Sequence, residues 1–256
     1  MRDAIVLWTN TRMVVLAAIS GSLYAAILIP FKILPIIPGV TELRPANAIP
    51  VLCSLLFGPA AAWGAAIGNT IGDFFGGIGP GSIFGFAGNF LYGYVPYKVW
   101  RALGLGDPNP RSPVHLAGLT FVTLLASATC AVTIGWGLNL FGFVPFAALG
   151  NIILVNNFVT AAILTPILLL AIFPRVRRAK LLYPDVAGPL AEPSRARAIA
   201  GILLIIVGVG GGMVAGNLLS SGGLTLFAGD SPTRSLDVGV GVLPFLALVL
   251  LGLALL

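Results

Sequence analysis

Charged side chains are scarce in this sequence. Asp, Glu, Lys and Arg make up only 9% of its 256 residues, whereas hydrophobic residues make up 58%. The mean hydropathy is +1.03, and a water-soluble domain cannot be built from so little polar surface. The apolar runs are continuous and do not alternate with polar residues, which argues against a membrane β-barrel. The sequence therefore predicts an all-α, polytopic helical bundle embedded in the lipid bilayer.

Metal-binding and catalytic side chains are equally scarce. The chain has one histidine, His115, and two cysteines, Cys53 and Cys130, each within an apolar run. This excludes a histidine metal cluster and a framework of several disulfides. The sequence has no phosphate-binding loop of glycines and lysine, and no serine has a histidine at comparable depth. We therefore expect no metal, no cofactor bound to this chain and no enzymatic activity.

The apolar runs predict eight membrane-spanning helices, most of them near the length of about 20 residues that a bilayer requires. They cover residues 13–34, 46–57, 60–75, 82–103, 114–140, 144–173, 198–219 and 236–256. Residues 1–175 then form a six-helix core, residues 176–197 a basic cytoplasmic linker, and residues 198–256 two additional transmembrane helices.

Lysines and arginines are distributed unevenly between the two predicted sides of the membrane. If the N-terminus is cytoplasmic, the inner side has Arg2, Arg12, Lys98, Arg101, Arg111, Arg175, Arg177, Arg178, Lys180, Arg195 and Arg197, and the outer side has Lys32, Arg44 and Arg234. Because basic residues favour the cytoplasmic side, we expect both termini in the cytoplasm and a location in a prokaryotic plasma (inner) membrane. The net charge of +6 thus reflects orientation and does not indicate a nucleic-acid partner.

Residues 41–81 contain polar side chains that are rare elsewhere in the chain. Asn69 and Asp73 are one helical turn apart and therefore share a face. The other members are Glu42, Arg44 and Asn47, on the same outer side. A carboxylate inside a membrane usually has a functional role. We expect these side chains to form a polar cup that binds a ligand, with a purely structural ion pair of Arg44 and Asp73 or Glu42 as the alternative.

Further polar side chains reach a similar depth on later helices. They are Asn89, Trp136, Asn139 and Asn151, with Asn156 and Asn157 beside the last of these. Amides in lipid need hydrogen-bond partners, which either another helix or a ligand can supply. Their shared position in the outer half suits a small, mostly neutral ligand with several hydrogen-bonding groups. The helix at 82–103 ends in Tyr92, Tyr94, Tyr97, Lys98, Trp100 and Arg101, a pattern typical of a membrane–water interface.

The first helix has two adjoining stripes of small residues. Ala17, Gly21 and Ala25 form one stripe, and Ala18, Ser22 and Ala26 form the other. Small residues at this spacing let helices approach closely. Either packing within the bundle or docking of a partner's helix explains them.

Three segments together resemble a known family. They are VLAAISGSLYAA in the first helix, ELRPANAIPVLCSLLFGPAAAWGAAIGNTIGDFFGG, and FGFAGNFLYGYVPYKVW. They resemble the S component, which is the substrate-binding membrane subunit of energy-coupling factor (ECF) vitamin transporters, and most closely its queuosine-transporter-like branch. The likeness runs from the first to the sixth predicted helix, about two-thirds of the chain, whereas the two C-terminal helices have no counterpart in the six-helix family.

The resemblance implies a fold and a function. Six helices would hold a vitamin-sized ligand near the outer surface, under a lid formed by residues 35–45, with Glu42, Arg44 and Asn47 beside the ligand. Ala17, Gly21 and Ala25, or the neighbouring stripe with Ala18 and Ser22, would contact a transmembrane coupling subunit. That subunit carries two cytoplasmic ATPases, so ATP is bound and hydrolysed on the partners.

These expectations describe a subunit that captures a small nutrient outside and topples with its coupling subunit to deliver it. Two alternatives remain at this point. The chain could be a stand-alone secondary carrier or channel in which Asp73 titrates or binds a cation. It could also be a membrane scaffold whose polar residues only pack helices together.

Overall fold

The structure, a computed structural model, describes residues 2–31, 35–37, 41–42, 44–188 and 193–256, without the side chains of residues 35–37 and 41–42. In chain order the elements are α1 (Asp3–Val6), η1 (Leu7–Thr9), α2 (Thr11–Phe31), β1 (Pro35–Ile37), β2 (Thr41–Glu42), η2 (Pro45–Asn47), α3 (Ala48–Phe57), α4 (Pro59–Gly76), α5 (Gly81–Ala102), α6 (Pro113–Leu140), α7 (Phe146–Arg178), α8 (Tyr183–Ala187), α9 (Arg195–Ser220) and α10 (Ser235–Leu255). The strands form one short antiparallel pair, and the prediction of an all-α membrane bundle is confirmed.

The helix boundaries follow local sequence signals. Gly58 adopts a φ of +58° and is followed by Pro59 at the first position of α4, which separates α3 from α4 by a single residue. Ser112 and Ser194 cap α6 and α9 by accepting hydrogen bonds from the backbone N–H groups of His115 and Arg197. These caps satisfy N–H groups that have no partner inside the helix.

Five helices among the described residues are long and apolar enough to cross a membrane, by length and composition. They are the helices that begin at Thr11, Pro113, Phe146, Arg195 and Ser235. The shorter α3 and the less apolar α4 and α5 are not among them, so the count of eight spans stays a prediction. The helix α7 also continues to Arg178, beyond the predicted end at residue 173, and α8 lies within the segment predicted as a linker.

Glycines set the close packing of α2 on α4. A Cβ atom on Gly64 would lie 2.5 Å from Ser20 Cβ, and one on Gly68 would lie 2.6 Å from the carbonyl oxygen of Gly21. No larger residue fits at these two positions without a backbone shift. Gly64 and Gly68 therefore form a seam that packs α4 directly against α2.

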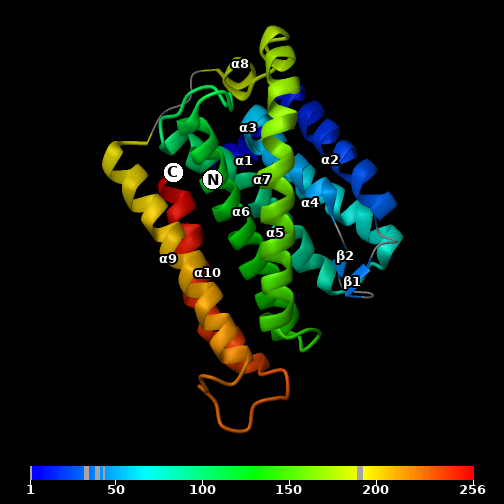
Figure 1. Cartoon of the computed structure of the whole chain (residues 1–256), viewed down its shortest axis with the longest axis vertical. Coiled ribbons are helices and arrows are strands. Elements are labelled where there is room, and N and C mark those ends of the chain that lie inside the picture. Colours follow the sequence, from blue (N-terminus) through cyan, green and yellow to red (C-terminus); the bar gives the residue numbers. More distant parts are fainter. Residues whose placement is uncertain (1, 32–34, 38–40, 43, 189–192) are drawn as a thin grey trace.

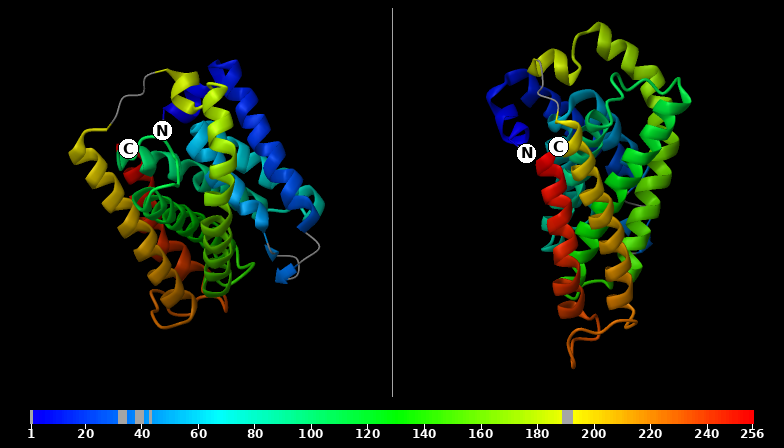
Figure 2. Two further views of the ribbon diagram at one scale, coloured as in Figure 1. Left: turned by 45° about the horizontal axis from the view of Figure 1, so that its top comes forward. Right: turned by 90° about the vertical axis from the view of Figure 1, so that its left-hand side faces the viewer.

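The C-terminal helices α9 and α10 form a closely packed pair on the opposite side of the bundle from α2 (Figure 1). A Cβ atom on Gly208 would lie 2.8 Å from the carbonyl oxygen of Phe245, so the two backbones nearly touch. The pair packs against α6, and the C-terminal end of α10 lies near α1 (Figure 2).

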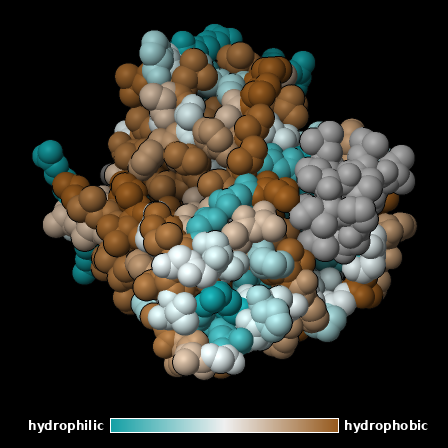
Figure 3. All heavy atoms as spheres, turned by 60° about the horizontal axis from the view of Figure 1, so that its bottom comes forward, coloured by the Kyte–Doolittle hydropathy of each residue, from teal (hydrophilic) through white to brown (hydrophobic). Residues whose placement is uncertain are grey.

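The two ends of the bundle differ in charge. The arginine-rich end, as we call it, has the last turn of α7, the loop of residues 103–112 and the start of α9 (Figure 1). The opposite end has the β1–β2 pair, the turn between α6 and α7, and the loop of residues 221–234. Figure 3 looks toward this second end, where hydrophilic and neutral residues gather between hydrophobic flanks. We call it the hairpin end.

Candidate functional site

A chain of hydrogen bonds joins Arg44, Asn69 and Asp73. Arg44 precedes the 3₁₀ turn η2, and its Nη1 donates to Asn69 Oδ1 over 3.2 Å. Asn69 Nδ2 donates to Asp73 Oδ2, one turn further along α4, over 3.1 Å. Asn69 is 2% exposed, so its side-chain amide bridges the Arg44 guanidinium and the Asp73 carboxylate away from solvent. We call these three residues the charged relay.

A second set of hydrogen bonds centres on Asn47, which is 1% exposed. Its Nδ2 donates to Asn157 Oδ1 on α7 over 2.6 Å, and its Oδ1 accepts from Tyr24 of α2 over 3.2 Å. The Tyr24 hydroxyl also lies 3.1 Å from Asn89 Oδ1 on α5. The Tyr92 hydroxyl donates to the backbone carbonyl oxygen of Asn47 over 3.0 Å. We call these five residues the amide hub.

The charged relay and the amide hub lie next to each other. Asn89 Nδ2 of the hub donates to the carbonyl oxygen of Gly85 over 2.9 Å. A Cβ atom on the same Gly85 would lie only 3.0 Å from Asn69 Nδ2 of the relay. The missing side chain at Gly85 therefore lets α5 approach α4 at this point and brings the two sets together.

The structure thus brings together Arg44, Asn47, Asn69 and Asp73 of the predicted cup, and it places Asn89, predicted at a similar depth, beside them. The side chain of Glu42 lies outside the described part of the structure. The arrangement offers a guanidinium, a carboxylate, amides and hydroxyls within a small region between α2, α4, α5 and α7. Such a set can recognise both donors and acceptors on one polar molecule.

Sequence reasoning did not select Tyr24 and Tyr92, which are both 0% exposed. The prediction that the aromatic residues at the end of α5 form a membrane–water belt is wrong, because Tyr92, Tyr94 and Trp100 pack inside the bundle. A tyrosine hydroxyl in a hydrophobic helix usually finds a hydrogen-bond partner when buried. The sequence did offer one signal for Tyr92, which lies only three residues from Asn89 and therefore on the same side of the helix and at nearly the same depth in the membrane.

Trp136, Asn139 and Asn151, also selected as site residues, lie against the C-terminal pair. Trp136 Nε1 donates to the carbonyl oxygen of Gly239 over 2.9 Å, and Asn139 Nδ2 donates to that of Thr233 over 2.9 Å. Asn151 Nδ2 donates to Asn217 Oδ1 on α9 over 2.6 Å. These three side chains therefore have partners on or beside α9 and α10, and the structure does not bring them to the charged relay.

The two stripes of α2 face different surroundings. Ala17, Gly21 and Ala25 are buried, and the first two contact Gly64 of α4. Ala18 and Ser22 are exposed, as are the neighbouring Val15, Ile19 and Leu23. Of the two stripes considered for partner docking, the one with Ala18 and Ser22 therefore faces outward, whereas the other holds the bundle together.

A separate polar cluster anchors the N-terminal segment at the arginine-rich end. The Asp3 carboxylate accepts hydrogen bonds from Tyr94 and Tyr97 and forms an ion pair with Lys98 Nζ at 3.2 Å. Burial raises the pKa of the Asp3 carboxyl, but the tyrosine hydroxyls and the ammonium outweigh burial, so the pKa lies below its ordinary value. Trp63 Nε1 also donates to the carbonyl oxygen of Ala4 over 2.7 Å, which fixes the same segment to α4.

No group of three or more His, Cys, Asp or Glu side chains among the described residues is placed to hold a metal ion. Cys53 and Cys130 are both buried free thiols.

The comparisons with known proteins bear on the first six predicted spans. The model of one protein family, described as the QueT transporter, matches residues 14–174. No curated protein and no solved structure matches the chain. The match runs from the first turn of α2 to most of α7, includes the charged relay and the amide hub, and ends before α9 and α10.

Proposed function

The chain belongs to the QueT transporter family of ECF S components, and from this premise we propose that it captures a small nutrient for import across the membrane. The observation that supports this most directly is the convergence of the charged relay and the amide hub within the matched residues. Charged and polar side chains are costly to keep inside a lipid-embedded bundle, and those that are kept usually serve transport or binding. The chain itself is a multi-pass membrane protein.

The ligand class that we propose is a deazapurine such as queuosine or its base. The edge of such a base has donors and acceptors side by side, which amides, a guanidinium and a carboxylate can pair. Asn69 and Asn89 each have donor and acceptor atoms, whereas Arg44 only donates and Asp73, when ionised, only accepts. The proposed contacts are Arg44, Asn47, Asn69, Asp73 and Asn89, with Glu42 from the loop before them.

The proposal includes partners. A transmembrane coupling subunit would contact the exposed stripe of α2 at Ala18 and Ser22, where small side chains permit close helix packing. Two cytoplasmic ATPases bound to that subunit would supply the energy, so ATP hydrolysis takes place on the partners and this chain performs no covalent chemistry. The concentration of basic residues at one end supports a cytoplasmic position for that end, in a prokaryotic plasma membrane.

The experiment is ligand binding by the purified full chain in detergent, without nucleotide. We expect one molecule of queuosine or its base to bind with submicromolar affinity, and guanine and thiamin to bind much more weakly. Mass spectrometry of small molecules that co-purify with the chain identifies the ligand independently. Absence of binding to every deazapurine, with another compound co-purifying, would overturn the ligand class.

A second measurement separates the S component from a stand-alone carrier. Liposomes that contain only this chain should show no ligand uptake under a proton or sodium gradient, whereas co-expression with a coupling subunit and ATPases should permit uptake. Gradient-driven uptake by the chain alone, abolished in Asp73→Asn, would instead establish a carrier. Loss of stability without loss of ligand binding in both Asp73→Asn and Arg44→Ala would leave only a structural role for the relay.

A further inference from the structure

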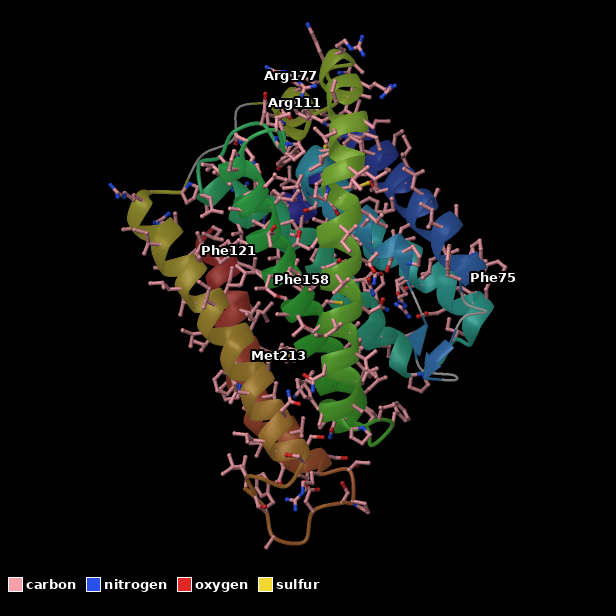
Figure 4. The ribbon with its side chains drawn as sticks, viewed as in Figure 1. Phe75, Arg111, Phe121, Phe158, Arg177 and Met213 are labelled. Carbon is pink, nitrogen blue, oxygen red and sulfur yellow. The ribbon has the colours of Figure 1, made fainter. Side chains whose placement is uncertain are left out.

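A groove with a basic rim lies at the arginine-rich end, on the side of α7. It has a volume of about 270 Å³. It is lined by Arg111 from the loop of residues 103–112 and by Arg177 and Arg178 from the last turn of α7, which we call its rim. Leu170 and Phe173 also line it, and we call them its floor. Figure 4 shows Arg111 and Arg177 next to each other at this end of the bundle.

The rim is held in place and keeps an excess of positive charge. Arg177 Nη1 pairs with Asp107 Oδ2 at 2.8 Å, and its guanidinium carbon lies 5.9 Å from the centre of the Phe173 ring. Arg178 Nε donates to the carbonyl oxygen of Pro174 over 3.2 Å. Asp107 thus pairs with one of the three guanidiniums that line the groove. The terminal nitrogens of Arg178 can still donate to an anion in the planar, two-pronged way that suits phosphate.

An apolar track leads from the groove along α7. Ile163, Ile167 and Leu170 are 58%, 60% and 44% exposed, and their spacing places them on one face of the helix. The track ends at Leu170, which is also part of the groove floor. A free anion would use the rim alone, whereas an amphiphile with an anionic head and an acyl chain would use both the rim and the track.

We propose that this groove binds the phosphate head of an anionic phospholipid, with one acyl chain along Ile163, Ile167 and Leu170. Basic pockets at the cytoplasmic end of membrane helices bind such headgroups, and each nearby Lys or Arg contributes measurably to the attraction. The lipid would bridge the loop of residues 103–112 and the end of α7, which Asp107 and Arg177 already join. The site is separate from the charged relay and does not depend on the transported ligand.

The test is native mass spectrometry of the full chain after titration with phosphatidylglycerol or phosphatidylcholine, and the readout is the affinity for the first bound lipid. We expect a clear preference for phosphatidylglycerol. The double variant Arg111→Gln and Arg178→Gln should lower that affinity about 25-fold, since each arginine near a membrane surface contributes about fivefold. The matched control is Arg175→Gln, because Arg175 is exposed on the same helix, bonds the carbonyl oxygen of Ala171 and does not line the groove.

Three results would overturn the proposal. The first is an equal affinity for the two lipids. The second is a loss of about fivefold in the Arg175→Gln control, as large for each arginine removed as in the double variant, which would mean a diffuse surface effect. The third is displacement of phosphatidylglycerol by millimolar inorganic phosphate together with an unchanged affinity in Leu170→Ser, which would mean a site for soluble anions. Leu170→Ser keeps all the arginines, so it tests the apolar track even if the double variant does not fold. The expected result for Leu170→Ser is weaker binding of the lipid.

Discussion

Replacement of Asn69 by leucine tests whether the charged relay binds a ligand. Leucine has the branched shape of asparagine, with two slightly larger methyl groups in place of the amide oxygen and nitrogen. Asn69→Leu therefore removes the hydrogen bonds to Arg44 and Asp73, 3.2 Å and 3.1 Å long, and leaves no cavity. Hydrogen bonds to charged groups contribute about 1.5–3 kcal/mol each. If a ligand depends on the relative placement of the guanidinium and the carboxylate, loss of one such contribution lowers its affinity roughly 10- to 150-fold.

The effect on folding should be much smaller. Hydrogen bonds between membrane helices contribute about 0.6 kcal/mol on average, because the unfolded chain in the membrane also finds partners. We therefore expect Asn69→Leu to lower the melting temperature only slightly while it strongly weakens ligand binding. Isothermal titration calorimetry and thermal unfolding in the same detergent measure the two effects on one preparation.

Thr70→Val is the matched control for this experiment. Thr70 is the next residue on α4, and its hydroxyl donates to the carbonyl oxygen of Ala66 on the same helix over 3.0 Å. The variant therefore loses a hydrogen bond of similar length that does not reach Arg44 or Asp73. Ligand affinity within twofold of the unmodified chain in Asn69→Leu, accompanied by a lower melting temperature, would refute the reasoning and make the relay a structural feature.

Four further predictions follow from the same structure. Gly68→Leu should destabilise the bundle by about 1–3 kcal/mol or prevent folding, because even a Cβ atom would lie 2.6 Å from the Gly21 carbonyl oxygen. Thermal unfolding measures this loss of stability, and the control Gly210→Ala, with no atom near its Cβ position, should have little effect. Ser22→Leu on the exposed face of α2 should weaken co-purification with a coupling subunit and leave ligand binding unchanged, and a loss of ligand binding would contradict this assignment. Trp136→Phe removes the hydrogen bond to the Gly239 carbonyl oxygen on α10 and should lower thermal stability with no change in ligand affinity. A large fall in ligand affinity would instead mean that Trp136 contacts the ligand. Asp3→Asn should lower the melting temperature at neutral pH, because the pKa of the Asp3 carboxyl is lowered in the folded chain. The stabilisation by Asp3 is present above the ordinary carboxyl pKa of about 4 and is lost as the pH falls toward the folded-state pKa. The difference in melting temperature between the two proteins should therefore narrow in strongly acidic buffer, and a constant difference would exclude this linkage.

The helical membrane class could be predicted from the sequence because it depends on composition and run length alone. Apolar runs near 20 residues give membrane helices whatever their neighbours are. The local geometry of the relay was also predictable, since Asn69 and Asp73 are one turn apart on any helix. The glycines at positions 64 and 68 likewise mark a face of α4 that another helix can approach closely.

The rotation of each helix about its own axis was decided only by the tertiary structure. The helix α2 is apolar on all sides, so its sequence does not indicate which of its two small-residue stripes faces the bundle. Asn47 and Asn157 are 110 residues apart and meet only because α3 and α7 pack together. Trp136 and Asn139 reach a similar depth to the relay residues but face α10 and the loop before it. Depth in the membrane can be read from position along a span, whereas the direction of a side chain depends on contacts among helices that are distant in the sequence.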